Sequence, residues 1–129
     1  MSKLKIQMSN QNQNPNVKKK YDLAERTARF GESIIELCLN IKRNSITSPI
    51  ISQAIRCATS IGANYAEADG AESKKDFRHK IAISKKECKE MQHWLRMIAK
   101  ACPDKKEICR KFWKEARELT LIFSAILNK

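Results

Sequence analysis

Glycine, proline and aromatic residues are scarce in this chain of 129 residues. It contains three glycines and three prolines, and Phe, Trp and Tyr together make up 6% of the sequence. Tight turns depend on glycine and proline, so a sheet-rich fold with many hairpins is disfavoured. Ala, Ile, Leu, Lys and Glu are abundant instead, and this composition favours helices within a single domain.

Long apolar runs and paired cysteine motifs are also missing. No stretch approaches the roughly 18 apolar residues of a membrane-spanning helix, and the N-terminal residues lack the apolar segment of a signal peptide. These absences predict a cytoplasmic protein with no metal, no cofactor and no membrane contact. The five cysteines form no C-x-x-C pair and are expected as small buried side chains: Cys38, Cys57, Cys88, Cys102 and Cys109.

The chain divides into an arm and one helical domain. Residues 1–17 are rich in Asn and Gln and show no periodicity, which predicts a disordered arm. Residues 18–129 hold four segments with helical period, joined by short connections near residues 44–47, 69–72 and 101–103. Because short connections make long helices of similar length antiparallel neighbours, the sequence predicts an all-α, antiparallel up-down four-helix bundle.

Start signals and core positions define these helices. Ser48 is expected to cap the second helix, with Pro49 as its first residue. Ser73 is expected to cap the third helix, and the fourth is expected to open at Pro103 or with Asp104 as its cap. The residues predicted to face the core are, helix by helix, Ala24, Ala28, Ile34, Ile35, Leu37, Cys38 and Ile41; Ile51, Ala54, Ile55, Ala58, Ile61 and Tyr65; Phe77, Ile81, Ser84, Cys88, Met91, Leu95 and Ile98; and Ile108, Phe112, Ala116, Leu119, Phe123 and Ile126.

The second helix carries almost no charge. Between Asn44 and Ala66 the only charged residue is Arg56, and apolar side chains extend most of the way round the helix. A lone bundle covers about a third to a half of each helix, so this helix needs a further covering surface. A second copy of the chain would supply one, and deep burial by the neighbouring helices and the arm is the alternative. The residues predicted to form this interface or its structural network are Ile51, Ile55, Ser60, Ile61, Gly62, Asn64, Tyr65 and Glu67.

A polar row interrupts this apolar helix. Ser60, Asn64 and Glu67 are spaced four and three residues apart, so their side chains lie on one side of the helix. A carboxylate near a helix C-terminus is unfavourable by about 0.3–1 kcal/mol, so Glu67 is expected to have a cation nearby, from the first or third helix. The row is interpreted as a polar network that fixes the register of packing. The alternative, Glu67 as a catalytic acid or base, lacks a partner at fixed spacing.

The stretch "ATSIGANYAEADG" at residues 58–70, followed by "SKKDFRHKIAISKKECKEMQHWL" at residues 73–95, resembles a known family. Its members are small four-helix-bundle proteins encoded in intervening sequences of bacterial large-subunit ribosomal RNA genes, together with the accessory variability determinant of diversity-generating retroelements. The resemblance runs from about Tyr21 to Ile126, although Gly70 does not follow the glutamate directly as it usually does in the family. It implies a homopentameric ring without known enzymatic activity; the retroelement members bind nucleic acid and a reverse transcriptase.

The chain is strongly basic, with 26 Lys and Arg against 14 Asp and Glu and a formal net charge of +12. An excess of this size favours polyanionic partners, above all nucleic acid, over the simpler explanation of solubility. Lys and Arg on helix surfaces contact phosphates rather than base edges. The residues predicted to bind nucleic acid lie on the third and fourth helices: Lys74, Lys75, Arg78, Lys85, Lys86, Lys89, Arg96, Arg110, Lys114 and Arg117.

Patterns of catalytic residues are missing. His79 and His93 stand 14 residues apart, too far to share a metal ion within one chain. Neither has an Arg four to six residues before it, the spacing in many RNA-cleaving helical bundles. A phosphate-binding Gly-rich loop and an H-E-x-x-H motif are missing too. Trp94 and Trp113 could stack on bases, but their positions at the edge of the core favour packing.

These observations favour one function over two others. The first is a non-enzymatic oligomeric scaffold that binds RNA or DNA through its basic surfaces, together with a protein partner such as a reverse transcriptase. The second is a protein–protein adaptor of the ribosomal RNA intervening-sequence type, whose basic faces dock an acidic partner. The third is a hydrolase, and no motif in the sequence supports it.

Overall fold

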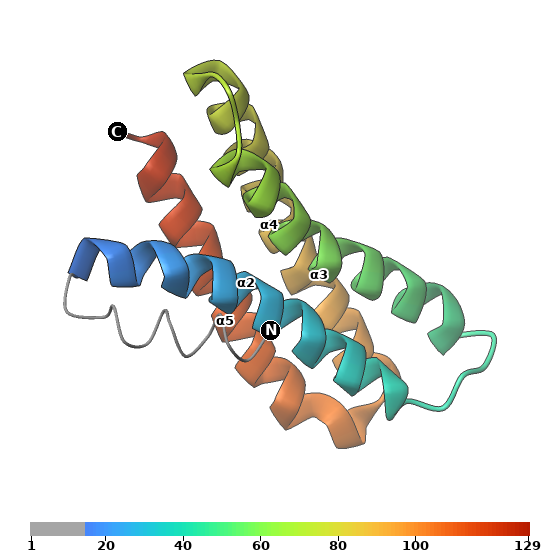
Figure 1. The fold of residues 1–129 in the computed structure, drawn as a ribbon. Coiled ribbons are helices and arrows are strands. Elements are labelled where there is room, and N and C mark those ends of the chain that lie inside the picture. Colours follow the sequence, from blue (N-terminus) through green and yellow to red (C-terminus); the bar gives the residue numbers. More distant parts are fainter. Residues whose placement is uncertain (1–14) are drawn as a thin grey trace, which may run out of the picture.

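The computed structural model describes the backbone of residues 15–129 and the side chains of residues 23–129. Within this range the chain forms helices and turns without strands. The elements are α2 (Pro15–Leu39), α3 (Thr47–Asp69), α4 (Lys74–Ala101), the short 3-10 helix η1 (Pro103–Lys105) and α5 (Lys106–Leu127). Successive long helices run antiparallel (Figure 1), which confirms the predicted all-α, four-helix architecture.

The first long helix differs from its predicted bounds at both ends. α2 begins at Pro15, so residues 15–17 belong to the helix, while residues 1–14 of the predicted arm lie outside the described residues. Proline suits a first helical position because its missing N–H would have no intrahelical partner there. α2 ends at Leu39, earlier than predicted, although Ile41 beyond its end is still buried.

The predicted start of α3 is wrong by two residues. The helix begins at Thr47, and neither Ser48 nor Pro49 starts it. Asn44 takes the role of the cap, because its Oδ1 accepts hydrogen bonds from the backbone N–H groups of Ile46 and Thr47, both at 2.9 Å. A side-chain oxygen three residues upstream thus satisfies a free N–H group of the first turn.

The predicted start of α4 is confirmed, and that of the fourth helix differs from the structure. Ser73 caps α4, and its Oγ accepts from the backbone N–H of Asp76 at 3.0 Å, which confirms that prediction. For the fourth helix, Pro103 opens the short 3-10 helix η1, and α5 itself begins three residues later at Lys106. Asp104 does not cap α5, since no side chain donates or accepts at that start.

The core follows the predicted stripes on α4 and α5 and departs from them on α2. The buried stripe of α2 is Leu23, Thr27, Phe30, Ile34, Leu37 and Cys38. Ala24, Ala28 and Ile35 were expected in the core and are exposed, because the larger residues one position away occupy the inner face. On the last two helices the buried residues are Ile81, Ser84, Glu87, Cys88, Met91, Leu95, Ile98, Cys109, Ala116, Leu119 and Phe123.

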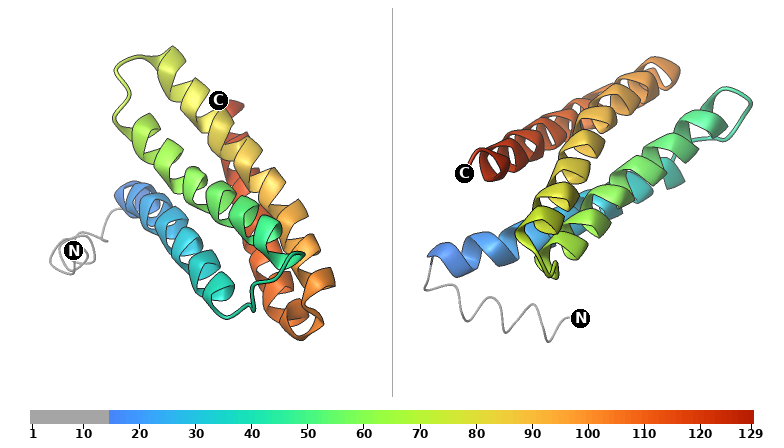
Figure 2. Two further views of the ribbon diagram at one scale, coloured as in Figure 1. Left: turned by 90° about the vertical axis from the view of Figure 1, so that its right-hand side faces the viewer. Right: turned by 90° about the horizontal axis from the view of Figure 1, so that it is seen from above.

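The near-apolar helix α3 lies between two neighbours of its own chain. Figure 2 shows it flanked by α2 on one side and α4 on the other, and it packs against both. Ile51, Ile61 and Tyr65 are consequently 1%, 0% and 7% exposed. The alternative in which neighbouring helices cover α3 therefore accounts for these side chains, and they offer a second copy almost no surface.

Two glycines let α2 and α3 approach closely. A Cβ atom built on Gly62 would lie 3.4 Å from Thr27 Oγ1, and one on Gly31 would lie 3.6 Å from the carbonyl oxygen of Ala58. Side chains larger than alanine at either position would push the helices apart. Gly62 is thus a packing residue within one chain.

α2 and α5 meet only over a short stretch and leave a groove beside it. At the crossing, the rings of Phe30 and Phe112 pack edge to face with centroids 6.5 Å apart. The groove between the two helices has a volume of about 680 Å³ and is rimmed by side chains of both signs. The bundle is therefore less closed on this side than between α3, α4 and α5.

Candidate nucleic-acid interface

All ten residues predicted to bind nucleic acid lie on the hairpin of α4 and α5. Lys85 is half-buried and the other nine are exposed. Arg110 is the one of the ten that forms an ion pair within the described residues, at 3.6 Å from Glu107. The other nine cations have no carboxylate within 4 Å in this part of the chain.

The glutamates of α4 are turned away from this surface and toward α3. Arg56 Nη2 lies 2.6 Å from Glu90 Oε2, and Arg56 Nη1 lies 3.4 Å from Glu87 Oε1. Trp94 Nε1 donates to the same Glu90 oxygen at 2.8 Å. Arg56 thus neutralises two carboxylates of α4 that would otherwise lie unpaired beside the cations of the same helix.

The glutamates in the middle of α5 are turned toward α2 in the same way. Arg26 donates from Nε and Nη2 to the two carboxylate oxygens of Glu115, at 2.7 and 2.8 Å, and from Nη2 to Glu118 at 2.7 Å. This fork-to-fork geometry is the strongest form of an arginine–carboxylate pair. The hydrogen bonds to Glu115 raise the pKa of Arg26 despite its partial burial, so the guanidinium stays charged.

These two arginine bridges separate the charges of the hairpin. Glu87, Glu90, Glu115 and Glu118 face inward to Arg56 and Arg26, and nine of the ten predicted cations on the same helices have no carboxylate partner among the described residues. Unpaired surface cations attract a polyanion more strongly than cations already neutralised by neighbours. The outer face of the α4–α5 hairpin is therefore the candidate interface.

The polar row of α3 forms the predicted network with a different central carboxylate. Asn64 Nδ2 donates to the carbonyl oxygen and Oγ of Ser60, at 2.9 and 3.0 Å. Ser60 Oγ in turn lies 3.5 Å from Glu87 Oε2, so the row is joined to α4 through Glu87. Glu67 stands apart and pairs with Lys80 of α4 at 2.8 Å, the cation predicted for it.

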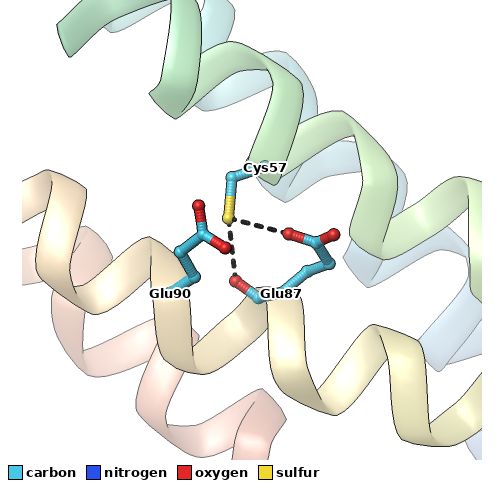
Figure 3. A group of neighbouring side chains, drawn as sticks. All are labelled: Cys57, Glu87 and Glu90. Atoms are coloured by element: carbon cyan, nitrogen blue, oxygen red, sulfur yellow. Dashed lines mark hydrogen bonds between the residues drawn. The ribbon is translucent and has the colours of Figure 1, made fainter.

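Cys57, Glu87 and Glu90 form the one cluster of possible metal ligands among the described residues, with ligand atoms within 4.8 Å of one another (Figure 3). Cys57 Sγ lies 3.0 Å from the carbonyl oxygen of Glu87 and 3.3 Å from its Oε1. Burial and the hydrogen bond to Glu87 raise the pKa of the thiol, so it stays protonated. Because Arg56 already pairs with both carboxylates, the cluster is a polar contact between α3 and α4.

Three further buried cysteines keep their protons for the same physical reason. Cys38, Cys57, Cys88 and Cys109 are buried and Cys102 is partly exposed, and all five are free thiols. Burial raises the pKa of Cys38 and of Cys109 to about 11 and that of Cys88 to about 12. The four buried cysteines act as small apolar side chains, as the sequence predicted, whereas Cys102 was predicted to be buried and is only partly so.

The two tryptophans occupy different surroundings. Both pack against the core from its edge. Trp94 is held by its hydrogen bond to Glu90 and by an edge contact with the ring of His93, whose centroid is 4.9 Å away. Trp113 has neither kind of partner among the described residues and lines a hollow of about 410 Å³ on the α4–α5 hairpin.

Comparison with known proteins identifies the family. Residues 10–125 match the family described as 23S rRNA-intervening sequence protein. The chain belongs to this family. The fold is similar to the crystal structure of a protein with unknown function from the S23 ribosomal protein family of Bacteroides thetaiotaomicron, with a TM-score of 0.73 and 25% identity over 83% of this chain and 99% of that one. No curated protein matches the sequence.

Membership of the intervening-sequence protein family confirms the resemblance carried by residues 58–70 and 73–95. Neither description names an enzymatic activity. Among the described residues, no helix has the length and apolar character needed to span a bilayer. The fold and the family are thereby established, and the unpaired cations of α4 and α5 indicate a surface suited to an anionic ligand.

Proposed function

We propose that this intervening-sequence protein is a non-enzymatic basic scaffold that binds the backbone of RNA or DNA through the outer face of α4 and α5. The separation of charge on this hairpin carries the proposal. Nine of the ten cations have no ion-pair partner among the described residues, while the glutamates at residues 87, 90, 115 and 118 are engaged by Arg26 and Arg56. Contacts of this kind reach phosphates and tolerate any sequence.

A salt titration tests the proposal. We expect the wild-type protein to bind a single-stranded RNA or a DNA duplex at about 50 mM salt and to lose affinity linearly on a log–log plot as salt rises. Three or more phosphate contacts would give a slope of about −2 or steeper. Failure to bind at low salt, or a slope near zero, would reject the proposal.

Self-association belongs to the same proposal, in the pentameric form that the family resemblance implies. Buried Ile51 and Ile61 no longer argue for it, but other apolar side chains of α2, α5 and the loop before α3 do. Leu39 is 79% exposed, Ile46 63% and Leu121 58%. Another protein surface could cover these exposed apolar side chains, and a second copy of the chain offers the same residues.

A protein partner is the remaining part of the proposal, and a reverse transcriptase is the kind that the resemblance implies. The adaptor hypothesis differs in its chemistry, because it uses the same cations to dock an acidic protein surface. A pull-down with and without nuclease separates the two. Partners that survive nuclease treatment and resist competition by free nucleic acid would favour the adaptor over the nucleic-acid scaffold.

A further inference from the structure

A hollow on the α4–α5 hairpin combines an aromatic side chain with cations. Its volume of about 410 Å³ falls within the roughly 300–1,000 Å³ of small-molecule sites. Trp113 lies in its wall, with Arg96 on α4 and Lys106, Arg110 and Lys114 on α5 around it. Apolar atoms make up most of the lining, as a stacking surface requires.

The charge of this hollow distinguishes it from the other grooves of the molecule. Its lining contains no acidic residue. The groove between α2 and α5 is lined by four glutamates among five cations, and the groove next to it by three acidic and two basic residues. In those two grooves carboxylates offset most of the positive charge, whereas the cations of the hollow beside Trp113 have no acidic residue in the same lining, so this hollow attracts an anionic chain most strongly.

The indole of Trp113 is free of the contacts that fix Trp94. Trp94 donates its N–H to Glu90 at 2.8 Å and has the ring of His93 beside it. Within residues 23–129, Trp113 has no hydrogen-bond partner and no aromatic neighbour, although it is only partly exposed. A flat ring that packs on the core from one side and lacks a polar partner is suited to take a second ring on its open side.

We propose that Trp113 and the surrounding cations form a base-stacking subsite for single-stranded nucleic acid. One unpaired base lies on the indole, and the flanking phosphates lie against Arg96, Lys106 and Lys114. This inference rests on the proposed function and adds a preference for single strands over duplexes, because a duplex keeps its bases stacked inside and cannot place one on the indole.

Substitution of Trp113 tests the subsite against a matched pair of ligands. The probes are a short oligoadenylate and a duplex of the same length, measured at the same salt concentration. Stacking contributes enough for Trp113→Leu to weaken single-strand binding roughly 5- to 100-fold, and Trp113→Phe is expected to retain most of it. Duplex affinity and the salt slope are expected to stay at wild-type values, because the cations are unchanged.

A fluorescence titration reads the same contact without altering Trp113. In the variant Trp94→Phe, Trp113 is the single tryptophan, so its emission is expected to be quenched when oligoadenylate binds. Wild-type affinity of Trp113→Leu for the oligomer, or unchanged emission at saturation, would overturn the subsite and leave backbone binding intact. Absence of any binding by the wild-type protein would overturn both.

Discussion

The two halves of this helical domain differ in charge far more than in fold. Residues 23–70, which hold most of α2 and all of α3, contain five basic and five acidic residues and have no net charge. Residues 71–129, with α4 and α5, contain sixteen basic and eight acidic residues, a net charge of +8. In the first half, α2 and α3 approach each other closely at small residues, and in the second half α4 and α5 carry exposed cations. Arg26 and Arg56 of the first half pair with glutamates of the second, which sharpens this contrast at the surface.

The largest expected effect comes from a charge placed inside the neutral half. Ile61 is 0% exposed within the single chain, so Ile61→Asp is expected to remove the fold, at a cost of at least about 4 kcal/mol. Circular dichroism during urea denaturation measures it. Ala63→Asp, two residues further on the exposed side of α3, is the control. If the Ile61→Asp variant instead folds and only its oligomer mass falls, Ile61 lies in an interface between copies and the expectation is wrong.

Alkaline pH is expected to destabilise both halves through their buried thiols. Burial raises the pKa of Cys38 and Cys109 from 9.0 to about 11 and that of Cys88 to about 12. The folded chain therefore keeps protons that the unfolded chain loses above about pH 9, so the stabilisation is complete below pH 9 and falls as pH rises toward 11. Urea denaturation at several pH values is expected to show that the free energy of unfolding falls by several kcal/mol over this range. The free energy of unfolding of Cys38→Ala is expected to fall less steeply with pH.

The two arginine bridges are expected to differ in strength. Arg56→Ala leaves Glu87, whose side chain is 12% exposed, without its cation, and is expected to cost about 2 kcal/mol. Arg26→Ala frees Glu115 and Glu118, at 31% and 63% exposure, and is expected to cost about 1 kcal/mol because water replaces the guanidinium. Chemical denaturation measures the free energy of unfolding of the two variants. Equal costs would mean that burial of the carboxylate does not set the strength of the bridge.

The smallest effect on stability is expected at an exposed apolar side chain. Leu39 is 79% exposed, so Leu39→Asp is expected to change the free energy of unfolding by less than about 0.5 kcal/mol. The same substitution is expected to lower the mass of the assembly in sedimentation velocity, because it puts a charge into the contact proposed between copies. Leu39→Gln serves as a milder control. An assembly of unchanged mass would place the contact elsewhere.

The sequence predicted the helices well because their periodicity and capping signals are local. The heptad-like stripe from Ile81 to Ile98 and the cap at Ser73 were both evident from spacing alone. The sequence did not distinguish which neighbour covers α3, since an apolar helix is compatible with a partner helix of the same chain or of another. The structure resolves this point for Ile51 and Ile61.

The arginine bridges were missed for a related reason. Arg26 and Glu115 are separated by 89 positions and Arg56 and Glu87 by 31, so no local pattern joins them. One signal was available: a lone Arg56 on an otherwise uncharged helix needs a carboxylate nearby. The predicted cation for Glu67 came from that kind of argument and was found in Lys80.

Matched neutralisation of the two halves tests the central claim most directly. Lys89→Gln with Arg96→Gln removes one lysine and one arginine from the basic face, and Lys42→Gln with Arg43→Gln removes the same charges from the loop after α2. If the outer face of α4 and α5 binds phosphates, the first pair is expected to reduce the salt slope of RNA binding by about 1.4–1.8 and the second to leave it unchanged. Equal reductions from both pairs would contradict the account, because binding would then depend on net charge and not on this surface.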